Sequence, residues 1–269
     1  MPTLAAITIE VPPTFEVGPL EVAWHGVMIA IGILAGSLLA VRYARERGLE
    51  VDRLQLAVFI VVLAGMVGAR FYYLVQAESD ALLRPADWFQ NVGFAFYGAL
   101  IGGAAAVGVY LWRARLSLRY LDALAAGFPL GMAVGRIGDV INGEHYGPAT
   151  TDPWGFRYTD PAAEVPSTQL AYQSGAFYEV LWALAMLAVL WPLRNRLRPP
   201  GAMLWATIGL YSIGRFLIFF IIRDTPIVAL GLRQAQWTSL ALCAIAALGL
   251  WFAYRQEKPS ATSSLAQKR

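Results

Sequence analysis

The sequence contains a single cysteine, Cys243, only two histidines, and charged residues at only 14% of its 269 positions. One cysteine excludes an internal disulfide framework. The formal net charge of +3 is too small and too evenly spread to indicate a nucleic-acid-binding protein. Two histidines without a cysteine pair provide no metal-binding pattern, so we expect no metal and no other cofactor. The chain also lacks a basic start followed by a small-residue cleavage site, which argues against a signal peptide.

Apolar residues, in contrast, are abundant. They make up 58% of the chain, aromatic residues make up 13%, and the mean hydropathy is +0.52. This composition excludes a single soluble core and a disordered chain. Only the polar tail, residues 255–269, has the composition of a disordered segment.

Seven apolar stretches approach the roughly 20 residues that a helix needs to cross a bilayer. We therefore predict an all-α integral membrane protein with seven transmembrane helices. The fourth stretch contains several glycines and Pro129, and we expect it to be interrupted and to line a cavity. The predicted spans are residues 22–41, 54–76, 93–112, 120–141, 174–192, 202–222 and 235–254.

Basic residues predict the orientation of the spans, because cytoplasmic loops are enriched in Lys and Arg. Fourteen of the 21 basic residues fall in alternate connectors or in the C-terminal tail. The amino terminus is thus expected outside and the carboxyl terminus inside. We assign residues 1–254 to one transmembrane domain, with an external loop segment at 143–173, and residues 255–269 to a disordered cytoplasmic tail. No internal repeat is evident, which argues against a transporter.

Three arginines lie inside or at the outer ends of predicted spans: Arg70, Arg136 and Arg215. A charge near membrane depth costs several kcal/mol unless it is paired or hydrated. Since a guanidinium is a rigid fork of donors suited to phosphate oxygens, three of them near one leaflet indicate a site for a lipid headgroup or another anion. Snorkelling to the interface and ordinary ion pairing are the alternatives. The acidic residues available for pairing are Asp122, Asp139 and Glu179.

The densest group of polar residues is the run 135–147, at the outer end of the fourth span. It combines Arg136 with Asp139, Asn142, Glu144 and four glycines. Backbone N–H groups and Arg136 can surround a phosphate there, while Asn142 and Glu144 fix the loop. The alternative is that Asn142 and Glu144 only stabilise a turn.

This run resembles the signature of the bacterial prolipoprotein diacylglyceryl transferases, G-R-x-G-N-x-x-N-G-E followed by an aromatic residue and Gly. Other motifs similar to that family occur in the expected order between residues 18 and 254. They are Gly18-Pro19-Leu20, Trp24-His25-Gly26, Gly68-Ala69-Arg70, the stretch 96–103 (FYGALIGG), Pro153-Trp154-Gly155, Tyr178-Glu179, Tyr211 with Arg215-Phe216, and Gln236-Trp237 with Ser239.

The resemblance implies transfer of the diacylglyceryl group of phosphatidylglycerol to a cysteine thiol, with release of glycerol phosphate. The implied partners are phosphatidylglycerol, the bilayer, and prolipoprotein signal segments carrying a lipobox cysteine; the implied location is the bacterial inner membrane, as a multi-pass protein. The thiol needs a proton acceptor, and guanidinium groups would stabilise the charge of the leaving phosphate. Since the nucleophile belongs to the substrate, we expect Cys243 only to pack.

Two departures from the family pattern are reciprocal. His25 stands where the family usually has Tyr, and Tyr97 stands where it usually has His. We expect both to face one cavity, with His25 as the proton acceptor and Tyr97 as a hydrogen-bond donor. The alternative is that both are ordinary residues of the membrane interface.

Two further departures concern charge. Asp139 stands where the family has Asn, and its carboxylate would neutralise Arg136. Phe219 stands where the family usually has Glu, one helical turn after Arg215. Glu179 and Asp224 are possible replacement partners for Arg215. These departures leave open a second hypothesis, a catalytically impaired lipid-binding or lipoprotein-binding paralogue on the same fold.

Overall fold

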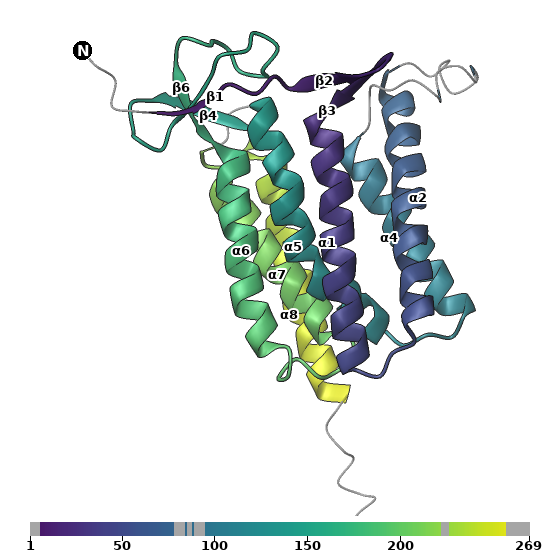
Figure 1. Cartoon of the computed structure of the whole chain (residues 1–269). Coiled ribbons are helices and arrows are strands. Elements are labelled where there is room, and N and C mark those ends of the chain that lie inside the picture. The colour runs from purple at the N-terminus through teal and green to yellow at the C-terminus, as the bar shows by residue number, and fades with distance from the viewer. Residues whose placement is uncertain (1–5, 78–83, 85–87, 89–94, 222–225, 257–269) are drawn as a thin grey trace, which may run out of the picture. The chain divides into compact units, whose positions relative to one another are not determined.

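The computed structural model describes residues 6–77, 84, 88, 95–221 and 226–256 (Figure 1). Each predicted span coincides with a helix in this part of the chain. The predicted tail, 255–269, lies outside the described residues except for its first two. The helices are α1 (Trp24–Glu46), α2 (Val51–Ala77), α4 (Phe96–Arg113), α5 (Arg119–Asn142), α6 (Gly175–Leu193), α7 (Ala202–Ile218) and α8 (Gln234–Gln256).

Five of these helices, α1, α2, α5, α6 and α8, are long and apolar enough to cross a membrane, and α7 is a shorter apolar helix. Large apolar side chains are exposed along them, including Leu38 and Phe59. In a water-soluble protein such side chains would be covered, whereas lipid can solvate them. The composition of the helices is that of a multi-pass membrane protein.

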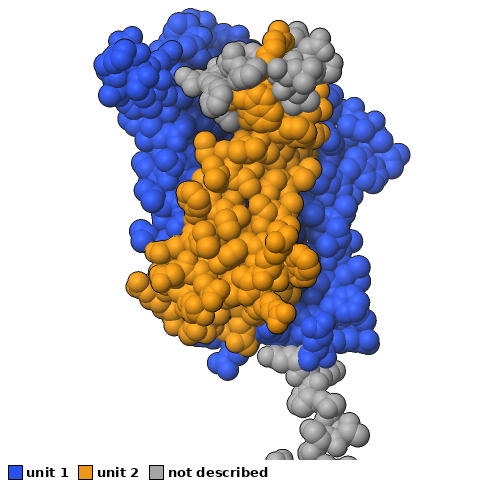
Figure 2. Space-filling model, turned by 90° about the vertical axis from the view of Figure 1, so that its right-hand side faces the viewer, with its two compact units in different colours: residues 1–40, 125–269 blue, residues 41–124 orange. Residues whose placement is uncertain are grey.

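The chain forms two compact units, which Figure 2 shows in different colours. The first unit contains residues 1–40 and 125–269, and the second contains residues 41–124. Helices α5 to α8 and most of α1 therefore belong mainly to the first unit, and α2 and α4 belong to the second.

In the first unit, glycines bring α1 and α5 into backbone contact. A Cβ atom built on Gly32 would lie 2.5 Å from the Gly131 carbonyl oxygen, and one on Gly36 would lie 3.0 Å from that of Gly127. Small residues at such crossings let two membrane helices approach closely. The expected interruption of this span was wrong, because α5 runs unbroken through Pro129. Gly127 and Gly131 pack against α1, and the expectation that the span lines a cavity stays a prediction.

The second unit contains a similar contact, between α2 and α4. A Cβ atom on Gly102 of α4 would lie 2.7 Å from the carbonyl oxygen of Ala64. The Ala95 amide, just before α4, donates to the carbonyl of Ala69 at 3.0 Å. These contacts hold the start of α4 against the middle of α2.

Short strands accompany the helices, which the all-α prediction did not include. A four-stranded sheet has the order β1-β5-β6-β4, with β1 parallel to β5 and the other pairs antiparallel. Two further hairpins pair β2 with β3 and β7 with β8. The strands are β1 (Ile7–Ile9), β2 (Thr14–Val17), β3 (Leu20–Ala23), β4 (Tyr146–Thr150), β5 (Phe156–Tyr158), β6 (Ala171–Ser174), β7 (Ile227–Ala229) and β8 (Leu232–Arg233).

The sheet has a small apolar core of its own, formed by Phe156, Tyr158 and Ala163. Val140 of α5 and Phe177 of α6 pack against this core. The segment between α5 and α6 thus folds onto the ends of both helices, as Figure 1 shows where β1, β4 and β6 are labelled.

Candidate functional site

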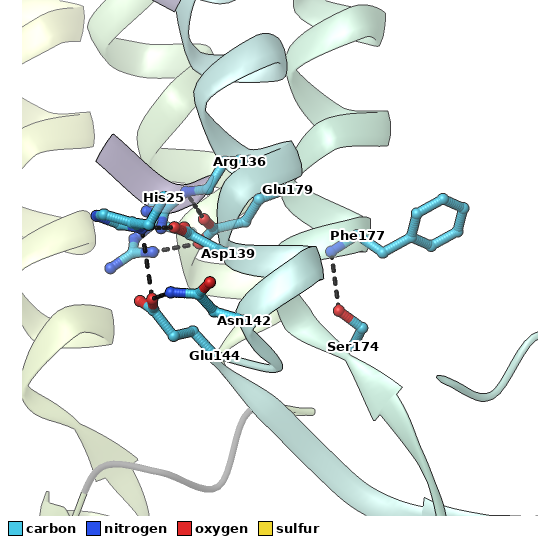
Figure 3. Close-up of polar contacts among 9 residues, drawn as sticks. His25, Arg136, Asp139, Asn142, Glu144, Ser174, Phe177 and Glu179 are labelled. Carbon is cyan, nitrogen blue, oxygen red and sulfur yellow. Dashed lines mark hydrogen bonds and ion pairs between the residues drawn. The ribbon is translucent and has the colours of Figure 1, made fainter. Parts of the chain in front are cut away.

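Polar side chains from four helices of the first unit meet at the end of α5 (Figure 3). We call this group the polar cluster. It consists of His25 from α1, Arg136, Asp139 and Asn142 from α5, Glu144 from the turn after α5, Glu179 from α6 and Arg215 from α7.

His25 contacts two carboxylates. Its Nδ1 atom lies 2.6 Å from Oδ1 of Asp139 and 3.3 Å from Oε1 of Glu144. The Asn142 amide donates to the same Glu144 oxygen at 2.9 Å. Because ionised carboxylates only accept hydrogen bonds, the proton of a neutral His25 lies on Nδ1, and Nε2 keeps its lone pair. The His25 side chain is 37% exposed, so its ring remains accessible to a substrate.

Gly138 allows His25 and Asp139 to meet. A Cβ atom at this position would lie 2.7 Å from the His25 Cα and 3.1 Å from the Met28 Cβ. Any larger residue would therefore push the start of α1 away from α5. The sequence indicated Gly138 only as an interruption of a span. The missed signal was the recurrence of glycine every three or four positions between 127 and 138, which is typical of closely packed membrane helices.

The segment between α5 and α6 holds the last turn of α5, whose carbonyl groups have no partners within the helix. The Tyr158 hydroxyl donates to the carbonyl of Val140 at 2.7 Å, and the Glu164 amide donates to that of Asn142 at 2.8 Å. Gly143 takes a left-handed conformation, with φ of 80°, that ends the helix. Burial raises the pKa of the Tyr158 phenol above its ordinary value. Sequence reasoning missed Tyr158.

The two arginines of the cluster are paired with carboxylates. Arg136 binds Asp139, and its Nε lies 2.5 Å from Oε2 of Glu179. Arg215 binds the other oxygen of Glu179, and its guanidinium lies 4.3 Å from the centroid of the Phe219 ring. Glu179 is fully buried. The ion-pair alternative considered for these arginines is therefore realised, and Glu179 partners Arg215 in place of the Glu that Phe219 replaces.

These pairs determine the charge of the polar cluster. With two guanidinium groups and three ionised carboxylates, it carries one net negative charge when His25 is neutral and none when His25 is protonated. The arginines thus add no surplus positive charge for an anion. Each guanidinium still has five N–H donors, more than these pairs use, so oxygen atoms of a substrate can share them.

Arg70 and Tyr97, the other two predicted site residues, belong to the second unit. Arg70 is buried in α2, where its guanidinium lies 5.4 Å from the centroid of the Tyr73 ring. Tyr97 is half-buried in the first turn of α4. The cluster in the first unit therefore contains Arg136 and Arg215, two of the three arginines.

One arrangement of possible metal ligands is present although the sequence showed no metal-binding pattern. A nitrogen of His25 and carboxylate oxygens of Asp139 and Glu144 all lie within 4.8 Å of one another. This donor set is acceptable to several divalent cations. However, Asp139 also binds Arg136, and Glu144 accepts a hydrogen bond from Asn142. The contacts of both carboxylates are those of a hydrogen-bonded network around His25.

Comparison with known proteins identifies relatives over almost the whole chain. Residues 12–252 match the model of the prolipoprotein diacylglyceryl transferase family. A phosphatidylglycerol–prolipoprotein diacylglyceryl transferase of Dehalococcoides mccartyi is 32% identical over 256 residues, covering 94% of this chain and 97% of that protein. Proteins of the same name from Thermosynechococcus vestitus and Clostridioides difficile are each 33% identical. They cover 91% and 84% of this chain, and 94% and 88% of their own lengths.

Proposed function

We propose that this chain, which belongs to the prolipoprotein diacylglyceryl transferase family, transfers the diacylglyceryl group of phosphatidylglycerol to the lipobox cysteine of prolipoproteins. Glycerol phosphate is the second product. The observation that supports a catalytic role for this site most directly is the continuous chain of contacts from His25 through Asp139, Arg136 and Glu179 to Arg215. It joins a proton acceptor to two groups that bind phosphate.

The proton acceptor in this proposal is His25. Asp139 holds the Nδ1 proton of the ring, so Nε2 accepts the proton of the substrate thiol. The thiolate then attacks the glyceryl carbon that bears the phosphate, a carbon–sulfur bond forms, and the carbon–oxygen bond to phosphate breaks. Asp139 acts as a positioning residue, because it touches the imidazole and not the reacting atoms.

Phosphate binding in this proposal falls to Arg136 and Arg215, whose donors outnumber those used by Asp139 and Glu179. These donors stabilise the charge that grows on the leaving phosphate. Asn142 and Glu144 keep the turn after α5 in place beside His25. On sequence grounds we assign Arg70 to lipid binding as well and Tyr97 to hydrogen bonding within the site.

The remaining sequence-based assignments also belong to this proposal. All seven helices would cross the bacterial inner membrane, with the amino terminus outside and residues 255–269 as a cytoplasmic tail. Residues 1–254 would then act as one transferase domain, with its site at the outer leaflet. Lipid would enter sideways between helices, because removing a diacyl chain from the bilayer costs about 0.8 kcal/mol per CH₂ group.

Two variants test the assignment of the acceptor. Purified protein in detergent is supplied with phosphatidylglycerol and a peptide carrying a lipobox cysteine, and release of glycerol phosphate is followed. We expect His25→Ala to lose at least about 100-fold in rate, as is usual for a general base, and Tyr97→Phe, which removes only a hydrogen-bond donor, to lose much less. Full activity of His25→Ala would exclude His25 as the acceptor. Lipid binding without release by the wild type would instead favour a binding paralogue.

A further inference from the structure

A pocket of about 380 Å³ lies beside the polar cluster, where the β7–β8 hairpin meets the end of α7 and the start of α8. Its volume is within the range of small-molecule sites, about 300–1,000 Å³. All of its lining residues belong to the first unit. They are Phe219, Phe220, Ile227, Gly231, Arg233 and Gln236.

The described lining of the pocket carries a positive charge that the polar cluster lacks. Among the described residues it contains one arginine, Arg233, and no acidic residue, and Asp224 lies outside the described residues. Among the residues that the structure describes, no carboxylate lies within ion-pairing distance of the Arg233 guanidinium, in contrast to those of Arg136 and Arg215. A lone guanidinium in a partly apolar pocket is attractive to a phosphate group.

Arg233 is also held in position. Its backbone amide donates to the Gln236 side chain at 2.9 Å, and the Gln236 amide donates to the Phe216 carbonyl at 3.2 Å. Gln236 is only 1% exposed. The backbone at Arg233 is therefore tied to α7 through a buried side chain, which lowers the cost of ordering this arginine when a ligand binds.

Phe219 connects this pocket to the polar cluster. Its ring lines the pocket and also carries the Arg215 guanidinium, at 4.3 Å from its centroid. Phe219 is uncharged, so this wall carries no carboxylate that would repel an anion. The contact with Arg215 places the pocket next to the arginine that we assign to the leaving phosphate.

We propose that this pocket is a subsite for the phosphoglycerol group, with Arg233 as the residue that binds its phosphate. This inference rests on the proposed function and adds a binding residue to it. The phosphate has two possible sources, the headgroup of phosphatidylglycerol before the reaction and free glycerol phosphate after it. Both present the same chemistry to Arg233.

Direct binding measurements test this subsite independently of turnover. The full chain in detergent is titrated calorimetrically with three soluble probes: dihexanoyl phosphatidylglycerol, glycerol phosphate and, for comparison, dihexanoyl phosphatidylcholine. Loss of a charge-assisted hydrogen bond predicts that Arg233→Gln weakens binding of at least one phosphoglycerol probe by about tenfold or more. Binding of the phosphatidylcholine probe should change less. Arg233→Lys, which keeps the charge but not the fork, should lose an intermediate amount.

Arg157→Gln is the matched control, because Arg157 is an exposed residue of β5 outside the pocket and the polar cluster. It should bind all three probes as the wild type does.

The Arg233 variants show which ligand uses the subsite. Weaker binding of the lipid probe alone by Arg233→Gln assigns the subsite to the substrate, and weaker binding of glycerol phosphate alone assigns it to the product. If folded Arg233→Gln and Arg233→Lys bind both phosphoglycerol probes like the wild type, the subsite is excluded. Failure of the transferase assay with binding intact would instead refute the proposed function.

Discussion

Replacement of Gly138 by alanine perturbs the polar cluster through the backbone alone. The new Cβ atom would lie 2.7 Å from the His25 Cα, whereas ordinary van der Waals contact begins at 3.4 Å. Helices α1 and α5 must therefore separate locally by about 0.7 Å. The His25–Asp139 contact of 2.6 Å would then lengthen to about 3.3 Å, just beyond the usual outer limit of a hydrogen bond, about 3.2 Å. Because a misplacement of about 1 Å can cost about 100-fold in rate, we expect Gly138→Ala to lose roughly 10- to 100-fold.

The assay is the release of glycerol phosphate from phosphatidylglycerol in the presence of a lipobox peptide, with melting temperature measured on the same preparations. Gly135→Ala serves as the control, because its Cβ atom would lie 3.9 Å from the nearest atom, the Ile29 Cα. This variant makes the same chemical change one helical turn away in a position that has room for it. It should keep the wild-type rate.

A folded Gly138→Ala protein with wild-type activity would refute the reasoning, because the close approach of α1 and α5 would then have no bearing on catalysis. Equal losses in Gly138→Ala and Gly135→Ala would refute it as well. In that case the effect would come from the general cost of removing glycine from the helix crossing and not from the position of His25.

The other predictions concern stability. Glu179→Ala should lower the free energy of unfolding by about 3–5 kcal/mol, since it leaves two guanidinium groups without their shared buried carboxylate, and thermal unfolding in detergent measures the loss. Burial raises the pKa of the Tyr158 phenol in the folded protein, so the unfolded chain loses the phenol proton first as pH rises. The contribution of Tyr158 to the free energy of unfolding is therefore complete below about pH 10 and declines above that pH. The wild type should therefore lose more stability than Tyr158→Phe between about pH 9 and pH 11, and parallel curves for the two proteins would contradict this assignment.

The helices were predictable because hydrophobic length is a local property of the sequence. Each apolar stretch coincides with a described helix, and the boundaries differ by a few residues. The strands were not predictable in this way, since they contain only two to five residues and, in the four-stranded sheet, β1 pairs with a strand that is distant in sequence. Ile7 of β1 pairs with Phe156 of β5, and nothing near either residue in the chain indicates the other.

The glycines of the fourth span illustrate a different limit. Sequence alone shows that Gly127 and Gly131 interrupt an apolar stretch, and such residues occur both beside cavities and at close helix crossings. Which of the two environments applies depends on the structure that faces these glycines, and in this protein helix α1 faces them. A different helix explains why α5 tolerates Pro129 without breaking: the Thr207 hydroxyl of α7 donates at 3.4 Å to the Ala125 carbonyl, which Pro129 leaves without an amide donor.

Charge pairing in the polar cluster was foreseen only in part, and the unforeseen part changes the account of phosphate binding. Asp139 lies three residues after Arg136, a spacing that predicts contact on one helix face. Glu179 lies on another helix, and no spacing indicates that it joins Arg136 to Arg215. The ion pairs of Glu179 with both arginines remove the cost of unpaired charges near the membrane, but they also neutralise the positive charge that would attract a phosphate. A substrate anion must share the donors of Arg136 and Arg215 with carboxylates already bound to them, so a guanidinium outside these pairs contributes more to lipid affinity. Arg233 satisfies that requirement among the described residues.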